Sequence, residues 1–110
     1  MQITLLKGYP DMVGRRRIFC GYGTGPTSYN ATTGDVLVVP GYETYIDAVF
    51  GGVQSVSGTY TIQVRPSLGG PRGTWSLHWF VTATGAEVTT VSATNLSAET
   101  VQIGFFGGQY

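Results

Sequence analysis

Charged side chains are scarce in this sequence of 110 residues. Six basic and six acidic residues cancel, so the formal net charge is zero. A neutral chain has no long-range field that would attract nucleic acid or an anionic membrane, and we expect neither as a partner. With little net charge to keep copies of the chain apart, the composition also favours self-association.

Cysteine and histidine occur once each, as Cys20 and His78. One cysteine cannot form an internal disulfide, and one histidine with one thiol cannot complete a zinc site. We expect Cys20 to be a small buried apolar side chain. We expect His78, which alternates with aromatic residues, to be half-buried with one hydrogen-bond partner. The sequence predicts no metal and no cofactor.

Residues suited to catalysis are few and scattered. A catalytic triad needs a nucleophile, a base and an orienting acid, and the single histidine is expected in the middle of a strand. Two facing carboxylates could serve a glycosidase, but nothing in the sequence selects a pair. The glycine-rich run 21–25 is followed by Pro26 and a polar tract, where a phosphate-binding loop requires a helix. We therefore expect that the protein is not an enzyme.

Long apolar runs are also missing. Residues 1–4 do not combine a basic start with an apolar stretch, as a signal peptide would, and no segment approaches the ~20 apolar residues of a membrane helix. We expect the chain to be made and folded in a cytoplasm.

Glycine and β-branched residues are abundant, with 17 Gly, 15 Thr and 12 Val against 6 Ala and 6 Leu. β-branched residues favour strands, and scattered glycines mark turns. Seven or eight short strands at even spacing, without helical periodicity, predict an all-β fold: an antiparallel β-sandwich or barrel, jelly-roll-like. The expected strands lie at 2–6, 15–22, 35–39, 42–50, 59–65, 75–82, 87–91 and 100–106.

The stretch from Gly58 to Gly85 predicts a hairpin of two long strands. Its second strand places Trp75 and Trp79 on one apolar face, which makes this hairpin the richest source of burial in the chain. The run 35–39 is expected to be buried on both faces. In the strand 42–50, alternation predicts that Ile46 shares a face with Ala48 and Phe50.

The chain is short enough for one domain, which we place at residues 15–110. Residues 1–14 are either an N-terminal arm or an edge strand of the same domain, since Pro10 and its neighbours interrupt the strand pattern. Ile3 and Leu5 lie on one face of this segment. An arm with strand character could add to the sheet of a neighbouring subunit, and we include both residues among the expected partner contacts.

Three further groups of residues are expected to contact a partner protein. The consecutive arginines 15–17 alternate between the faces of a strand and offer forked donors to carboxylates, although the end of a strand in solvent would look the same. The hairpin loop is stiffened by prolines and carries two arginines. Tyr110 ends an aromatic-rich chain, and aromatic residues gather at contacts, on sugar-binding platforms or in a core poor in leucine. The residues concerned are Arg15, Arg16, Arg17, Arg65, Pro66, Leu68, Arg72 and Tyr110.

Four segments carry a resemblance to a known class of protein: GRRRIFCGYGT, TGDVLVVPGYETYIDAVFGG, SGTYTIQVRPSLGGPRGTWSLHWFVTATGAEV and NLSAETVQIGFFG. In texture and order the chain resembles the small head decoration, or cement, proteins of tailed bacteriophages. The resemblance implies a β-sandwich or barrel, often trimeric, that sits on the outside of the capsid and clamps neighbouring major capsid proteins.

The expected function is therefore that of a structural virion protein, with the major capsid protein and further copies of itself as partners, the latter in a homotrimer. Two alternatives remain open. One is another phage structural subunit, from the tail, neck or fibre. The other is a carbohydrate-binding β-sandwich module.

Overall fold

The computed structural model describes residues 1–13, 16–38, 46–51, 54–66, 74–89 and 95–107. Within these ranges the chain forms strands and no helix, so none of the described segments is a helix that could cross a membrane. The eight strands are β1 (Thr4–Leu5), β2 (Asp11–Val13), β3 (Arg16–Thr24), β4 (Asp35–Val36), β5 (Ile46–Gly51), β6 (Tyr60–Pro66), β7 (Trp75–Val81) and β8 (Thr100–Gly107).

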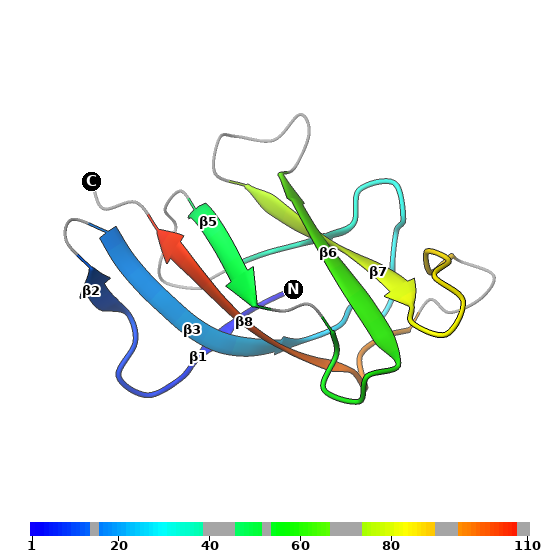
Figure 1. The fold of residues 1–110 in the computed structure, drawn as a ribbon, viewed down its shortest axis with the longest axis horizontal. Coiled ribbons are helices and arrows are strands. Elements are labelled where there is room, and N and C mark those ends of the chain that lie inside the picture. The colour runs from blue at the N-terminus through cyan, green and yellow to red at the C-terminus, as the bar shows by residue number, and fades with distance from the viewer. Residues whose placement is uncertain (14–15, 39–45, 52–53, 67–73, 90–94, 108–110) are drawn as a thin grey trace.

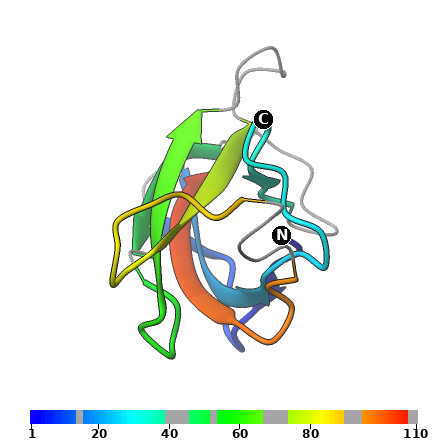
Figure 2. The ribbon, with the colours of Figure 1, turned by 90° about the vertical axis from the view of Figure 1, so that its right-hand side faces the viewer.

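The strands form two antiparallel sheets that face each other as a sandwich (Figures 1 and 2). The five-stranded sheet has the order β1-β3-β8-β5, with β2 also paired to β3. The three-stranded sheet has the order β4-β7-β6, and its β6–β7 pair is the predicted hairpin, in register from Tyr60 opposite Val81 to Pro66 opposite Trp75. The prediction of an antiparallel all-β fold, consistent with a β-sandwich, is confirmed.

Side chains from the inner faces of both sheets form one core. Phe19 of β3 stacks on Phe105 of β8 with ring centroids 4.9 Å apart, and Trp79 of β7 meets the ring of Tyr60 edge-on. Trp75 is partly buried, and its indole N–H donates to the carbonyl of Ile46 on the opposite sheet (2.6 Å). The expectation that the tryptophan face of the hairpin fills the core is confirmed.

Two predictions about the faces of strands were wrong. The run 35–39 was expected to be buried on both faces, but Asp35 and Leu37 are buried while Val36 and Val38 are exposed, so the described part of this run alternates. Its strand β4 has only two residues, and residue 39 lies outside the described part. In β5 a bulge between Ile46 and Ala48 turns Ile46 into the core but leaves Ala48 and Phe50 on the outer face. The extra residue of a bulge shifts the phase of a strand, so Ile46 and Phe50 do not share a face as predicted.

Strand boundaries also differ from the expectations. Residues 7–11 were expected to interrupt the strand pattern, yet Asp11 begins β2, because residues 11–13 pair with the beginning of β3. The expected strand 87–91 is represented by a single bridge between Glu87 and Phe80, and its residues 90 and 91 lie outside the described part. The expected residues 42–45 also lie outside the described part, so β5 begins at Ile46.

Candidate functional site

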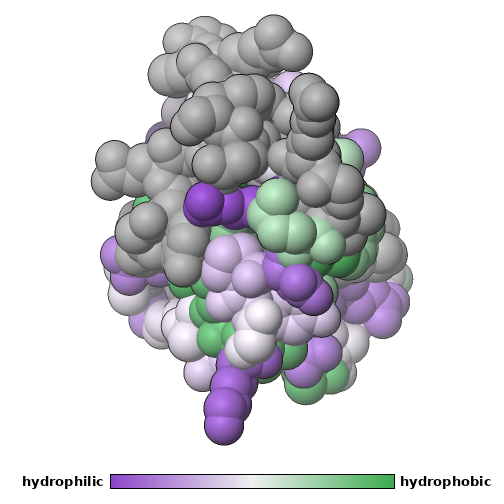
Figure 3. All heavy atoms as spheres, turned by 90° about the vertical axis from the view of Figure 1, so that its left-hand side faces the viewer, coloured by the Kyte–Doolittle hydropathy of each residue, from purple (hydrophilic) through white to green (hydrophobic). Residues whose placement is uncertain are grey.

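The outer face of the five-stranded sheet is unusually apolar. An antiparallel sheet with one face on the core normally turns polar side chains to water on its other face. On β3 the outward positions carry Ile18, Cys20 and Tyr22, and on β8 they include Phe106. Figure 3 views the molecule from the end that lies on the left in Figure 1, and hydrophobic and hydrophilic residues are mixed over its coloured area.

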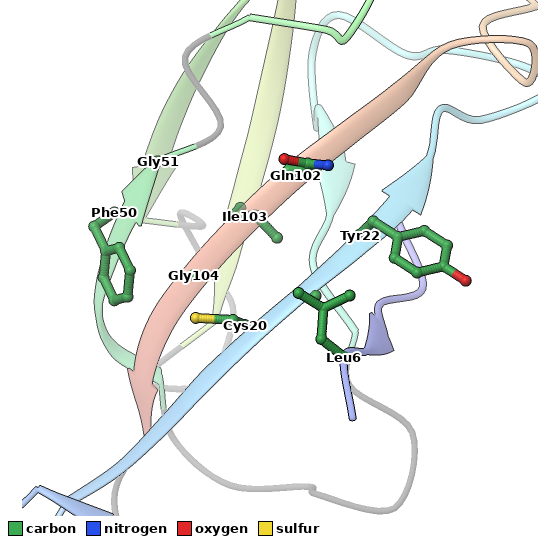
Figure 4. A pocket seen from close by; sticks show the side chains of 9 residues that line it. Leu6, Cys20, Tyr22, Phe50, Gly51, Gln102, Ile103 and Gly104 are labelled. Carbon is green, nitrogen blue, oxygen red and sulfur yellow. The ribbon is translucent and has the colours of Figure 1, made fainter. Parts of the chain in front are cut away.

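A groove of about 310 Å³ crosses this face. Figure 4 shows Leu6 and Tyr22 on one side of the groove, Phe50 on the other, and the bare backbone of Gly104 between them. Leu6, Tyr22 and Phe50 are 49%, 42% and 41% exposed, so each presents about half of its surface to solvent. We call this feature the β3–β8 groove.

Gly104 creates the groove by lacking a side chain. A Cβ atom at this position would lie 2.3 Å from Cε2 of the Phe50 ring, closer than real Cβ contacts allow. The ring therefore lies over the glycine, where it also meets Phe106 at a centroid distance of 5.5 Å. Any larger residue at position 104 would displace the ring and fill the groove.

Among the residues that the structure describes, none that lines the groove is acidic or basic. The polar side-chain groups of the lining are the amide of Gln102, the hydroxyl of Tyr22 and the thiol of Cys20. Cys20 is partly exposed, not buried as expected, because its position in β3 faces outward. A hydrogen bond with this thiol raises the pKa of the Tyr9 phenol above its ordinary value. Such a lining suits an uncharged, mainly apolar partner group.

A polar cluster lies against the three-stranded sheet, apart from the β3–β8 groove. The backbone N–H of Trp79 donates to the hydroxyl of Tyr29 (3.0 Å), and this hydroxyl donates to Oε2 of Glu87 (2.9 Å). The same oxygen lies 2.9 Å from Nδ1 of His78. His78 has the partner that the sequence predicted, but at 5% exposure it is buried instead of half-buried.

The titration of this cluster follows from its burial and hydrogen bonds. Burial raises the pKa of Tyr29 well above its ordinary value, which keeps the hydroxyl protonated and able to donate. Burial alone would raise the pKa of Glu87, but the hydrogen bonds from His78 and Tyr29 outweigh it and hold the pKa below its ordinary value. The cluster ties the loop at Tyr29 and the segment at Glu87 to β7, which is a structural task.

The predicted contact residues in the N-terminal segment lie inside the chain's own fold. Thr4 and Leu5 pair with Tyr22 and Gly21 of β3, so this segment pairs within its own chain. Ile3 is 4% exposed and belongs to the core, and Leu5 packs partly against it. A truncation of residues 1–12 would remove core side chains and could not leave the fold intact.

The other predicted contacts are dispersed. Arg16 and Arg17 occupy successive positions at the start of β3, whereas Arg65 and Pro66 end β6 in the other sheet. Nε of Arg65 donates to Oε1 of Gln63 (2.9 Å), and its guanidinium carbon lies 6.0 Å from the centroid of the Phe80 ring. Of the side chains that the structure describes, those of Arg17, Arg65 and Pro66 do not line the β3–β8 groove. The remaining predicted contacts lie outside the described residues: Arg15, Leu68, Arg72 and Tyr110.

Sequence reasoning missed the residues that form the groove. Leu6 and Phe50 were assigned to strands without a role at a surface, and the alternation that buries Ile46 would have buried Phe50 as well. The one signal in the sequence was that Cys20 and Tyr22 alternate with Phe19, which places them on the opposite face of the strand from Phe19.

In comparisons with known proteins, no family model, no curated protein and no solved structure matches the chain.

Proposed function

We propose that the protein is a structural virion protein that binds the outer surface of a phage capsid and stabilises the particle by bridging major capsid proteins. The observation that supports this best is the uncharged β3–β8 groove on an apolar sheet face. Exposed apolar areas on small proteins mark interaction sites. The resemblance described above supplies the identity of the partner, and a role in contact requires no catalytic chemistry.

The groove can contribute a moderate binding energy. Full burial of a large apolar side chain contributes about 1.5–3 kcal/mol, so covering the exposed halves of Leu6, Tyr22 and Phe50 would contribute roughly 1 kcal/mol each. The outer face of β3, β8 and β5 measures roughly 30 Å by 14 Å, which gives an area on the order of 400 Å². A standard protein–protein interface buries about 800 Å² on each partner, so this face has about half of that area.

This modest area favours an oligomer over a single bound copy. Linked copies bind together more tightly than each does alone, because the later contacts form at high effective concentration. We therefore propose that the protein binds the capsid exterior as a homotrimer, assembled from chains made in the host cytoplasm. Such an assembly would bridge neighbouring capsid proteins with several weak apolar contacts.

Undecorated capsids provide the direct test. The wild-type protein should co-sediment with them at a saturating, fixed ratio and should raise the temperature at which the particles break open. Phe50→Ser should weaken binding about fivefold, the factor that corresponds to ~1 kcal/mol. Val56→Ser, at a 67% exposed residue that does not line the groove, should bind like the wild type. Absence of saturable binding and of any gain in particle stability would refute the proposal.

A carbohydrate-binding role is the second candidate. The rings of Tyr22 and Phe50 flank the groove together with the amide of Gln102, and aromatic rings combined with a polar group can hold a sugar. A glycan array followed by titration of the best binder distinguishes this role. A monomer that binds glycans, and loses them on Tyr22→Ala, would favour it. Co-purification with tails or fibres instead of heads would favour another structural subunit.

A further inference from the structure

The N-terminal residues fill a slot between the edges of the two sheets. On one side β1 pairs with β3. On the other side the backbone N–H of Ile3 donates to the carbonyl of Val38, and the N–H of Val38 donates to the carbonyl of Met1, both at 2.8 Å. We call residues 1–5 the N-terminal strand and the space that they occupy the N-terminal slot.

Two glycines of β3 give the slot its depth. A Cβ atom on Gly21 would lie 2.4 Å from the carbonyl oxygen of Thr4 and 2.7 Å from Cγ2 of Ile3. A Cβ atom on Gly23 would lie 2.5 Å from Cγ of Met1. All three distances are shorter than real Cβ contacts, so only glycine at these positions leaves room for an added strand with apolar side chains.

The far end of the slot recognises an amino group. The amino group of Met1 forms an ion pair with Oδ1 of Asp35 (2.5 Å) and also donates to the carbonyl of Val36. The carboxylate is buried, and its second oxygen, Oδ2, has no hydrogen-bond partner among the described residues. The slot therefore fits an extended segment with a free amino group and with apolar first and third residues, a known mode of peptide recognition.

The connection that follows the N-terminal strand is well suited to act as a hinge. Lys7 and Gly8 are exposed, and Gly8 has a φ of 95°, in the region that favours glycine. Within the turn, the backbone N–H of Tyr9 donates to the carbonyl of Leu6 (3.2 Å). This turn can extend without displacing any core side chain.

We propose that the N-terminal slot also accepts the N-terminal strand of a second copy, so that copies associate by strand exchange. Every contact that the strand makes within one copy is repeated between two copies, and the two arrangements differ only in the hinge and in the dependence on concentration. Reciprocal exchange yields a dimer, and cyclic exchange yields a trimer. The inference deepens the self-association in the proposed function and does not involve the groove.

Two single-cysteine variants test the exchange in the full chain. Thr4→Cys and Tyr22→Cys are each made with Cys20→Ser, and the two proteins are mixed at high concentration and oxidised. Thr4 and Tyr22 are direct partners in the register of β1 and β3, at a spacing that a disulfide can bridge. Since each chain has one cysteine, a disulfide across the slot requires the strand of the other copy.

The control pair combines Thr4→Cys with Val56→Cys, whose cysteine is exposed away from the slot. Strand exchange predicts at least fivefold more covalent heterodimer with Tyr22→Cys than with Val56→Cys on a non-reducing gel. Equal yields would overturn the proposal. The assay contains no capsid, so its failure is distinguishable from a failure of capsid binding. Light scattering of the wild type then separates reciprocal from cyclic exchange.

A peptide provides a second readout that does not depend on opening the hinge of the donor copy. A peptide of residues 1–7 with Thr4→Cys is oxidised together with the Tyr22→Cys protein. We expect about tenfold more attachment than with the same peptide carrying Ile3→Asp, and less attachment when the amino group is acetylated. Equal attachment of the three peptides would show that the slot does not select a strand and would refute the inference.

Discussion

The outer faces of the two sheets differ in how they meet solvent. On the three-stranded sheet polar side chains bond to one another: the hydroxyls of Thr61 and Thr82 lie 3.0 Å apart, and Arg65 donates to Gln63. On the five-stranded sheet the corresponding face carries half-exposed apolar side chains around a glycine. Both sheets contribute side chains to the same core from their inner faces. The apolar face is the one that a partner would cover.

The largest expected effect is a difference in the free energy of unfolding between substitutions on the inner and the outer face of β8. Phe105→Ala removes a ring that is stacked in the core and should lower the free energy of unfolding by about 3–5 kcal/mol. Phe106→Ala, one residue along on the outer face, should lower it by about 1 kcal/mol. Urea unfolding of both variants measures the difference. Equal losses would mean that the outer face stabilises the fold and is not free for contact.

The second effect concerns the polar cluster beside β7. Glu87→Gln replaces the carboxylate that accepts hydrogen bonds from Tyr29 and His78, and should lower the free energy of unfolding by about 1–3 kcal/mol. Gln63→Ala, on the exposed part of the same face, should change it by less than about 0.5 kcal/mol. Urea unfolding again measures both. An unchanged free energy of unfolding in Glu87→Gln would show that the cluster does not hold this sheet together.

The third effect is a dependence on pH at the polar cluster. Because the pKa of Glu87 in the folded protein lies below its ordinary value of 4.5, the unfolded chain takes up this proton first as the pH falls. Its stabilising contribution is therefore complete above about pH 4.5 and is lost as the pH drops through the folded pKa. Urea midpoints should fall with acid less steeply in Glu87→Gln than in the wild type. If the urea midpoints of the two proteins fall equally with decreasing pH, Glu87 is not the source of the pH dependence.

The smallest effect on stability is expected in the groove. Phe50→Ser shortens a side chain that is 41% exposed and should lower the free energy of unfolding by less than about 1 kcal/mol, although it should weaken capsid binding. Thermal unfolding of the isolated protein measures this, with Val56→Ser as the matched variant. A much larger loss would place Phe50 among the residues that hold the fold together.

The accuracy of the sequence predictions depended on whether a segment was organised locally. The β6–β7 hairpin was placed correctly, because its two strands are neighbours in the chain and alternate regularly around Trp79. The outward turn of Phe50 was missed, because the bulge beside Ile46 is set by pairing with β8. The role of Tyr29 was missed for a similar reason: its hydroxyl meets the backbone of Trp79, fifty residues away.

The sequence by itself determined the class of fold and the shortage of catalytic groups, since composition and local alternation are sufficient for both. Tertiary structure alone decided which apolar side chains face solvent and where the N-terminal strand lies. The phase of a strand relative to the core depends on bulges and on its partners in the sheet, and these are contacts between distant residues. The groove over Gly104 and the slot over Gly21 and Gly23 exist only because separate strands meet there.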